Sequence, residues 1–256
     1  MIYNYTVMSK YISYSLWGSN KVYTYGMIEN VLTAKELYKG WTVRIHYNNT
    51  VPNEIIEWLK TQENVTLIHH DDMKTKASNT FWRFEDLFLK DAVVLIRDSD
   101  SRLSEREVTC VNEWLQSNKD FHIMRDHEHH TVPILAGMMG CRNNCLEYLG
   151  IPNGNGNVNA CPMHFEKGID FMKRFLKSIP TNMDRYNIDQ IFLAQYVYNY
   201  IICNTYIHCS HNAYEPFCKK MNPVETGFIG EISMDLKNAT RIFNDSSEVF
   251  ERIPEY

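Results

Sequence analysis

The stretch from Ala92 to Asp100, AVVLIRDSD, decides the fold. Its first five residues are apolar and rich in β-branched side chains, which is typical of a central strand buried on both faces of a sheet. The charged residues that follow place two carboxylates, Asp98 and Asp100, at the end of that strand. In open α/β sheets, ligands bind beyond the carboxyl ends of the strands. The stretch therefore predicts an α/β sheet and the position of its site.

Short β-rich runs alternate with helical patterns along the chain, as expected for βαβ units and a largely parallel sheet. Ser104 and Glu107 have the spacing of a capping box ahead of a helix. Residues 141–163 are rich in Asn, Gly and Cys and predict a flexible loop. The predicted strands cover residues 11–16, 42–47, 65–68, 92–96, 121–124 and 205–208, and the predicted helices cover residues 20–39, 53–60, 81–89, 164–177 and 187–199.

Composition limits the class of protein. With 256 residues and 44% hydrophobic content, the chain can bury a substantial core, and we expect one domain over residues 1–256. Within it, a first half would run to about residue 100, where the central strand ends, and a second half would cover about residues 101–256. The net charge of −5 comes from mixed acidic and basic residues without a basic stripe, which argues against nucleic acid as a partner.

The cellular compartment of the protein is predicted from three kinds of sequence signal: membrane-spanning segments, a secretory signal and cysteine spacing. The longest apolar stretches fall short of the roughly 20 residues that span a bilayer, so no transmembrane segment is expected. The first 18 residues lack a basic region followed by an apolar block and a cleavage site, so we expect a cytoplasmic protein. Seven cysteines, an odd number without compact disulfide spacing, favour reduced thiols.

Asp98 and Asp100 are candidate ligands for a hard divalent cation. Carboxylates separated by one residue at a strand end can both turn toward one Mg²⁺ or Mn²⁺ and leave positions for phosphate oxygens and water. Such a cation neutralises charge on a departing nucleoside diphosphate. A solvated turn after the strand is the competing interpretation of this short motif.

Longer blocks of sequence carry a resemblance to a known family. The chain resembles glycosyltransferases of the GT-A fold, and among them the group that includes the glycosyltransferase domain of a chlorella virus capsid-glycosylating protein. The resemblance implies a GT-A (Rossmann-like) nucleotide-diphospho-sugar transferase fold, with a single mixed, mostly parallel sheet flanked by helices. The matching blocks are YISYSLWG, VYTYGMIENV, GWTVRIHYNNTVP, FWRFEDLF, VVLIRDSDSRLSEREVTCVNEWL, FHIMRDHEHH, ILAGMMG, DQIFL, IHCSHNAYEPF and FIGEI.

The implied reaction is metal-dependent transfer of a sugar from a nucleoside diphosphate sugar, a UDP-sugar by expectation, to a hydroxyl of a glycan, glycoprotein or other glycoconjugate. The resemblance favours retention of the anomeric configuration. Mn²⁺ or Mg²⁺ is the implied cofactor. A competing interpretation is an inactive module of the same fold that binds a sugar nucleotide or carbohydrate. A nucleotidyltransferase is disfavoured, because no glycine-rich loop follows the first strand.

Site residues carried over by the resemblance fall into three groups. Asp189 is the implied catalytic carboxylate, although a helix N-cap is an alternative use of Asp there. His208 is the implied third metal ligand, with His211 close enough to be confused with it, and a histidine ligand would favour manganese. Arg83 is implied to face the donor phosphates or sugar, with a surface ion pair as the alternative. Donor contacts are expected from Leu16, Trp17, Gly18, Tyr23, Arg83, Asp98, Ser99 and Asp100, and sugar-pocket contacts from Asp126, His127, Ala136, Gly137, Asp189 and Gln190.

Other clusters admit simpler interpretations. The tryptophan and tyrosine residues near Leu16 could form an aromatic core cluster instead of a nucleotide site. Cysteines and histidines of the second half do not match the spacing of a zinc finger or ribbon. The runs HHDD at residues 69–72 and DHEHH at residues 126–130 are expected to be solvated loops.

Overall fold

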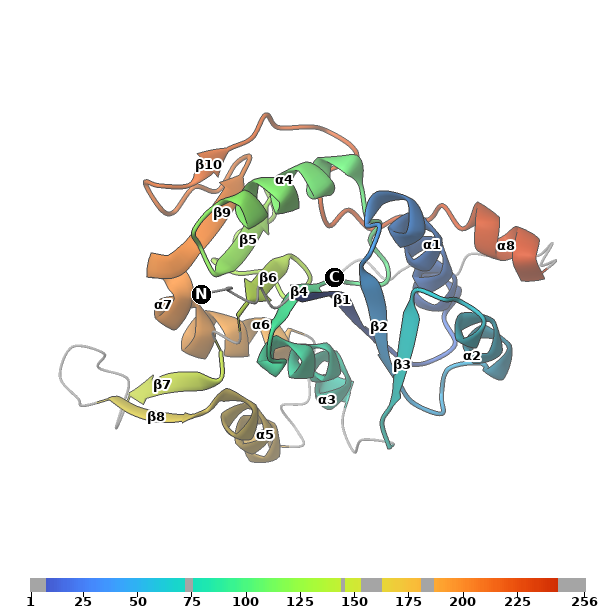
Figure 1. Ribbon diagram of the computed structural model, residues 1–256, viewed down its shortest axis with the longest axis horizontal. Coiled ribbons are helices and arrows are strands. Elements are labelled where there is room, and N and C mark those ends of the chain that lie inside the picture. Colours follow the sequence, from blue (N-terminus) through green and yellow to red (C-terminus); the bar gives the residue numbers. More distant parts are fainter. Residues whose placement is uncertain (1–7, 72–75, 144–145, 153–162, 181–186, 244–256) are drawn as a thin grey trace, which may run out of the picture.

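The computed structural model describes residues 8–71, 76–143, 146–152, 163–180 and 187–243 (Figure 1). Its strands are β1 (Ser9–Leu16), β2 (Thr42–Tyr47), β3 (Val65–His69), β4 (Ala92–Ile96), β5 (Phe121–Arg125), β6 (Met139–Arg142), β7 (Tyr148–Pro152), β8 (Met163–Lys167), β9 (Thr205–Cys209) and β10 (Lys219–Lys220). Eight of them form one sheet in the order β10-β9-β5-β6-β4-β1-β2-β3, and β7 and β8 form a separate antiparallel pair. Within the large sheet, β6 runs antiparallel to β4 and β5, and the other pairs are parallel. The mixed, mostly parallel sheet is thus confirmed.

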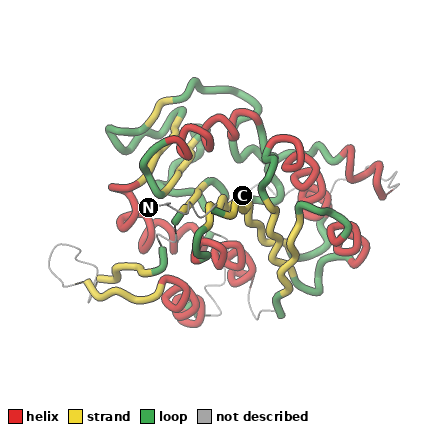
Figure 2. Tube along the Cα trace, in the orientation of Figure 1, coloured by secondary structure: helices red, strands yellow, loops and turns green. Residues whose placement is uncertain are grey.

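The sheet lies at the centre of the molecule, and helices cover both of its faces (Figure 2). The side chains of strand β4 form part of the core on both faces of the sheet. Val93 and Leu95 pack into one core cluster, while Val94 and Ile96 pack into the other. A strand buried on both faces must be apolar throughout. The first cluster includes α1 (Lys21–Leu37), α2 (Asn53–Lys60), α4 (Glu105–Gln116) and α8 (Lys237–Phe243), and the second includes α3 (Lys76–Phe81), the 3-10 helix η1 (Trp82–Phe88), α5 (Gly168–Ser178), α6 (Ile188–Phe192), the π-helix η3 (Leu193–Val197) and α7 (Tyr198–Ile201).

The order in which strands are added to the sheet changes direction between β1 and β4. From β1 the chain passes to β2 and β3 on one side, and it then returns to β4 on the other side of β1. The two central strands are parallel, with Ser13 opposite Ile96. At such a switch point the loops leaving the two carboxyl ends diverge and leave a crevice that binds ligands. Asp98 and Asp100 lie at this edge of the sheet.

Most predicted elements are confirmed, including the cap of α4, where Ser104 Oγ accepts from the amide of Glu107. The predicted helical segment over residues 81–89 is confirmed as the 3-10 helix η1, which directly follows the end of α3 at Phe81. The helix expected from residue 164 begins at Gly168, since residues before it pair with β7. The expected flexible loop contains the last two residues of β6, all of β7 and the first residue of β8, and its centre, residues 153–162, lies outside the described residues.

The expectation of reduced thiols is wrong for one pair. Cys209 at the end of β9 forms a disulfide with Cys218, which directly precedes β10. The parallel pairing of β10 with β9 brings the two cysteines together across a short loop, which their scattered spacing did not indicate. Cys110 and Cys203 carry free thiols. Among the described residues, the helices are too short or too polar to cross a bilayer.

Candidate active site

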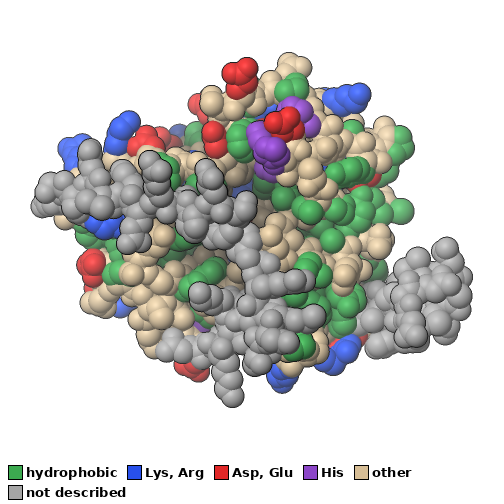
Figure 3. Space-filling model, turned by 180° about the vertical axis from the view of Figure 1, so that it is seen from behind, with side chains coloured by type: hydrophobic (Ala, Val, Ile, Leu, Met, Phe, Trp, Pro, Cys, Tyr) green, Lys and Arg blue, Asp and Glu red, His purple; other side chains and the backbone are tan. Residues whose placement is uncertain are grey.

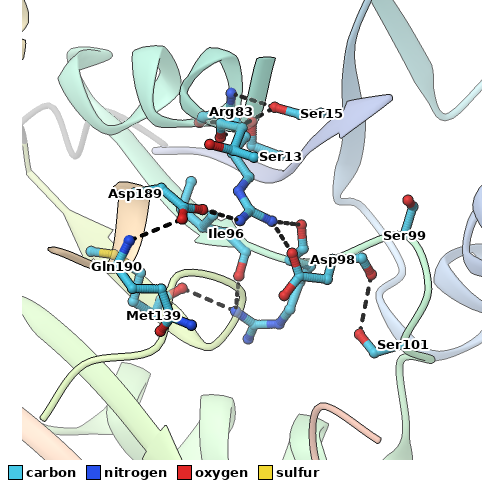
Figure 4. A network of polar contacts seen from close by, with 12 residues as sticks. Ser13, Ser15, Arg83, Ile96, Asp98, Ser99, Ser101, Met139, Asp189 and Gln190 are labelled. Carbon is cyan, nitrogen blue, oxygen red and sulfur yellow. Dashed lines mark hydrogen bonds and ion pairs between the residues drawn. The ribbon is translucent and has the colours of Figure 1, made fainter. Parts of the chain in front are cut away.

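Arg83 lies at the centre of the candidate site, on the 3-10 helix η1 that packs on β1 (Figure 4). Its backbone is held by strand β1: the amide donates to Ser15 Oγ at 3.0 Å, and the carbonyl accepts from Ser13 Oγ at 3.0 Å. Both serines face η1 because side chains alternate along a strand, and their apolar neighbours face α1. Sequence reasoning missed these serines, although small polar residues on one face of a buried strand were a usable signal.

The guanidinium of Arg83 connects two carboxylates that come from distant parts of the chain (Figure 4). One nitrogen, Nη1, donates to Asp98 Oδ1 and to the carbonyl of Arg97, and Nη2 donates to Asp189 Oδ2 at 3.1 Å. The side chains of Arg83 and Asp189 are 7% and 8% exposed, whereas that of Asp98 is 45% exposed. Arg83 and Asp189 therefore form the buried part of the site, and the carboxylate of Asp98 is the group that a ligand can reach from solvent.

Electrostatics favour a cation beside these carboxylates. Burial, reinforced by the charge of Asp98, raises the pKa of Asp100 to about 6. Burial also raises the pKa of Asp189, although Arg83 opposes that shift. Burial disfavours the charged form of Arg83, but Asp98 and Asp189 outweigh it and raise its pKa. A buried carboxyl such as that of Asp100, which resists ionisation beside a second acid, gains most from a divalent ion.

Gly137 makes room for Asp98. A Cβ atom at residue 137 would lie 1.8 Å from Asp98 Oδ2, a distance that no side chain could tolerate. The neighbouring Ala136 is buried in the core beneath the sheet, which fixes the loop. The predicted pair Ala136 and Gly137 thus lies at the site, with Gly137 against the carboxylate of Asp98.

Gly137→Ala should displace Asp98 without removing any polar group of the site. Overpacking of this kind costs about 1–3 kcal/mol, so we expect about a 5- to 150-fold loss of divalent-ion binding at Asp98. Calorimetric titration measures the loss, and circular dichroism checks that the variant folds. Gly40→Ala is the matched control: Gly40 has φ +79° and open space around it, so its substitution should lower stability and leave binding unchanged.

The residues expected to hold the nucleotide lie at the carboxyl end of β1. Trp17 packs edge-on against Trp82 at 6.5 Å, and His70 stacks on Trp82 at 4.7 Å. Gly18 has φ +74°, and its amide donates to Thr50 Oγ1 at 2.7 Å. The other expected contacts differ in exposure, since Leu16 is part of the core and Tyr23 is 36% exposed. An aromatic wall exists here, and its contact with a nucleotide stays a prediction.

Asp189 is not a helix N-cap. Asn187, with φ 71°, occupies that position of α6, and the carboxylate of Asp189 faces Arg83. Its other oxygen accepts from the amide of Gln190 at 2.9 Å. The alternative use of Asp189 as a cap is therefore wrong, and its catalytic role stays a prediction. Gln190 directly follows Asp189 on the same helix (Figure 4).

Ser99 and Asp126 are held mainly by the protein itself. The carbonyl of Ser99 accepts from Arg102 at 3.1 Å. Asp126 is fully buried and receives two hydrogen bonds of 2.6 Å from Arg106 and one from the amide of Ile229. These contacts describe structural anchors, so a direct contact of either residue with the substrate stays a prediction.

The contacts of His208 do not support its assignment as a metal ligand beside the aspartates. Its ring bonds to His122 at 2.9 Å and to Glu113 of α4 at 3.0 Å. Strand β9 lies three places from β4 in the sheet order, about 14 Å away at the usual strand spacing. Period-two alternation turns this side chain toward α4. His211 is exposed and bonds to Ser210, and its use as the alternative metal ligand stays a prediction.

Part of the DHEHH run is solvated, as expected. Glu128 and His129 are exposed, with side chains 68% and 83% accessible, and Figure 3 shows histidine side chains gathered at the surface of one face. His127 instead stacks on Phe228 at 4.1 Å. Burial, with the neighbouring charge of His127, lowers the pKa of His130 to about 4. The run therefore packs one side of its loop against the C-terminal part of the chain.

Acid should destabilise the fold through its buried histidines. Burial lowers the pKa of His122 well below the ordinary value, so the folded state resists protonation. An unfolded histidine titrates near pH 6.5, so the unfolded state binds more protons below about pH 6.5. Stability from His122 is complete above that pH and is lost as the pH falls, with a slope of up to about 1.4 kcal/mol per pH unit. Urea unfolding at several pH values should show this slope, shallower in His122→Gln and unchanged in His129→Gln.

Comparisons with known proteins give distant structural similarity. Neither a known protein family nor a curated protein sequence matches this chain. A mannosyltransferase from Pyrobaculum calidifontis, solved with GDP-Man and Mn²⁺, is 11% identical with a TM-score of 0.41, and the match covers 54% of this chain and 45% of that one. The present chain thus spans less than half the length of that enzyme.

Two nucleotidyltransferases are similar at the same level. A protein described as a glucose-1-phosphate thymidylyltransferase from Bacillus anthracis, in complex with sucrose, has 12% identity and a TM-score of 0.40, over 79% of this chain and 86% of that one. A 4-diphosphocytidyl-2C-methyl-D-erythritol synthase from Anaerococcus prevotii has 13% identity and a TM-score of 0.39, over 93% and 96%. Function is therefore argued from the site.

Proposed function

We propose that the protein is a metal-dependent glycosyltransferase that uses a nucleoside diphosphate sugar, with a UDP-sugar as the first candidate donor. One observation carries the proposal: Arg83 joins Asp98, beyond the central strand β4, to Asp189 at the start of α6, at the switch point of the sheet. A cation-binding carboxylate, a phosphate-binding guanidinium and a second carboxylate together suit the departure of a diphosphate from a sugar.

The donor set fits a hard divalent ion. Asp98 is half exposed, and Asp100 follows it on the same turn. Carboxylate oxygens are preferred ligands of Mg²⁺ and Mn²⁺, and a site with few protein ligands leaves positions for phosphate oxygens and water. When bound, the ion would supply charge neutralisation for the diphosphate leaving group. The sequence argument for manganese over magnesium depended on His208 as a ligand, so it does not apply to a site formed by Asp98 and Asp100 alone.

The protein's own residues have separate tasks in this proposal. Arg83 orients the donor phosphates by bidentate hydrogen bonding, for which a planar guanidinium is well suited. Asp189 presents its carboxylate to the anomeric carbon, where positive charge develops during sugar transfer, and Arg83 holds that carboxylate in place. Trp17 and Gly18 border the base and ribose at the end of β1.

The first test is calorimetric titration of UDP and of GDP into the protein, each with and without Mn²⁺ or Mg²⁺. Metal-dependent binding of a nucleoside diphosphate is expected. Hydrolysis of the matching nucleotide sugar without acceptor then separates a transferase from an inactive binding module, which should release no sugar. The absence of diphosphate binding under every metal condition would contradict the proposal.

A further inference from the structure

Three potential metal-binding side chains converge on the face of the sheet that η1 covers. His46 comes from β2, His70 directly follows β3, and Glu85 lies on η1. One ligand atom from each lies within 4.8 Å of the others. Among the residues that the structure describes, this is the group of His, Cys, Asp and Glu whose atoms come close enough to share one ion. It does not include Asp98 or Asp100.

Asp86 orients His46 as an outer carboxylate. Its Oδ2 accepts from Ser13 Oγ at 2.7 Å, pairs with Arg44 at 3.0 Å and bonds to His46 Nε2 at 3.0 Å. An acceptor held in this way requires the proton of His46 on Nε2, which leaves Nδ1 with its lone pair. Histidine ligands of metals are oriented by carboxylates in this manner.

The lone pair on Nδ1 of His46 points into the group. Its Nδ1 lies 2.8 Å from Nε2 of His70, so the proton between the two rings belongs to His70. A tautomer shift that moves this proton to the other nitrogen of His70 presents two imidazole lone pairs to one ion, with no net proton release. Glu85 adds a carboxylate oxygen, and both it and His70 are only partly buried, so an ion has a route from solvent.

We propose that His46, His70 and Glu85 bind a zinc-type divalent ion, with Asp86 as the orienting carboxylate. Two histidines and one carboxylate, with a fourth position left for water, form a ligand set that suits Zn²⁺. Imidazole ligands favour transition metals over Mg²⁺, so this site and the aspartate site differ in the metal they select. Nothing in the proposal depends on sugar transfer.

The ion would stabilise the segment that carries Arg83. Glu85 is two residues from Arg83 on η1, and His70 stacks on Trp82, the residue before Arg83. A bond from the ion to these side chains would tie β2, the end of β3 and η1 together. Binding to the folded state alone raises stability with ligand concentration. Zinc should therefore raise the midpoint of urea unfolding.

The test uses the Asp98→Ala/Asp100→Ala double variant as parent, so that the other carboxylates cannot bind the ion. Equilibrium dialysis with Zn²⁺ should give one ion per chain, and Co²⁺ should give visible absorption bands of a low-symmetry site. Loss of an outer carboxylate costs about 10–100-fold in metal affinity, so removing a direct ligand by His70→Ala should cost at least as much.

Two further variants make the test decisive. Glu85→Gln keeps the size of the side chain and should weaken Zn²⁺ binding without unfolding the protein. His69→Ala removes an exposed neighbour that bonds to Asn49, and it should bind Zn²⁺ as the parent does. The proposal is overturned if the parent binds no Zn²⁺, or if His70→Ala and Glu85→Gln bind it as tightly as the parent.

Discussion

An Asp98→Asn/Asp100→Asn double variant is expected to lose metal-dependent nucleotide binding and to transfer sugar about 1000-fold or more slowly. Lewis-acid stabilisation of the leaving group contributes several kcal/mol, and each 1.4 kcal/mol corresponds to about a factor of ten in rate. Asparagine keeps the shape of each side chain but removes the charge that holds the ion. Calorimetry with the nucleoside diphosphate and a transfer assay measure the two effects.

The control for this variant is Asp235→Asn. Asp235 pairs with Lys237 at the surface, with side chains 59% and 88% exposed, so losing its charge should change neither binding nor transfer. A double variant that still binds the nucleotide in a metal-dependent way would remove the aspartates from the donor site. Retained transfer at the parent rate would contradict the proposed function.

Asp189→Asn should slow the chemical step and leave donor binding nearly intact. A positioned carboxylate contributes about 10²–10⁴-fold in rate, so kcat should fall by about that factor. Arg83 can still donate to the amide oxygen of asparagine, which keeps the guanidinium in place for the phosphates. Transfer at saturating donor measures kcat, and calorimetry measures donor binding. This split distinguishes Asp189 from the two metal-binding aspartates, for which both quantities should fall.

Asp170→Asn is the matched control, because Asp170 also lies in the first turn of a helix, α5, but is exposed. Its kcat should equal that of the parent. An unchanged kcat in Asp189→Asn would assign the carboxylate a structural role as the partner of Arg83. A loss of donor binding equal to the loss of kcat would place it in the phosphate site instead.

The local sequence was sufficient to predict the bounds of those strands and helices whose structure depends mainly on their own side-chain pattern. The strands Thr42–Tyr47 and Ala92–Ile96 and the helix Asn53–Lys60 have the predicted bounds. In each, side-chain periodicity and the flanking residues agree on one structure. The sequence did not indicate the type of helix after Phe81, where Ser13 and Ser15 of β1 hold the backbone of Arg83 in a 3-10 helix. Such contacts leave no periodic signal in the segment itself.

The sequence by itself determined the buried central strand and the two aspartates that follow it, because a continuous apolar run must be covered on both faces and its polar end must reach solvent. Only the tertiary structure decided which side chains from distant parts of the chain lie beside these two aspartates. Asp189 meets Arg83 across a separation of 106 residues because η1 and α6 pack on the same face of the sheet. Strand alternation turned His208 to the opposite face, toward Glu113 of α4. Contacts between distant segments depend on how helices pack, and packing is a property of the whole chain.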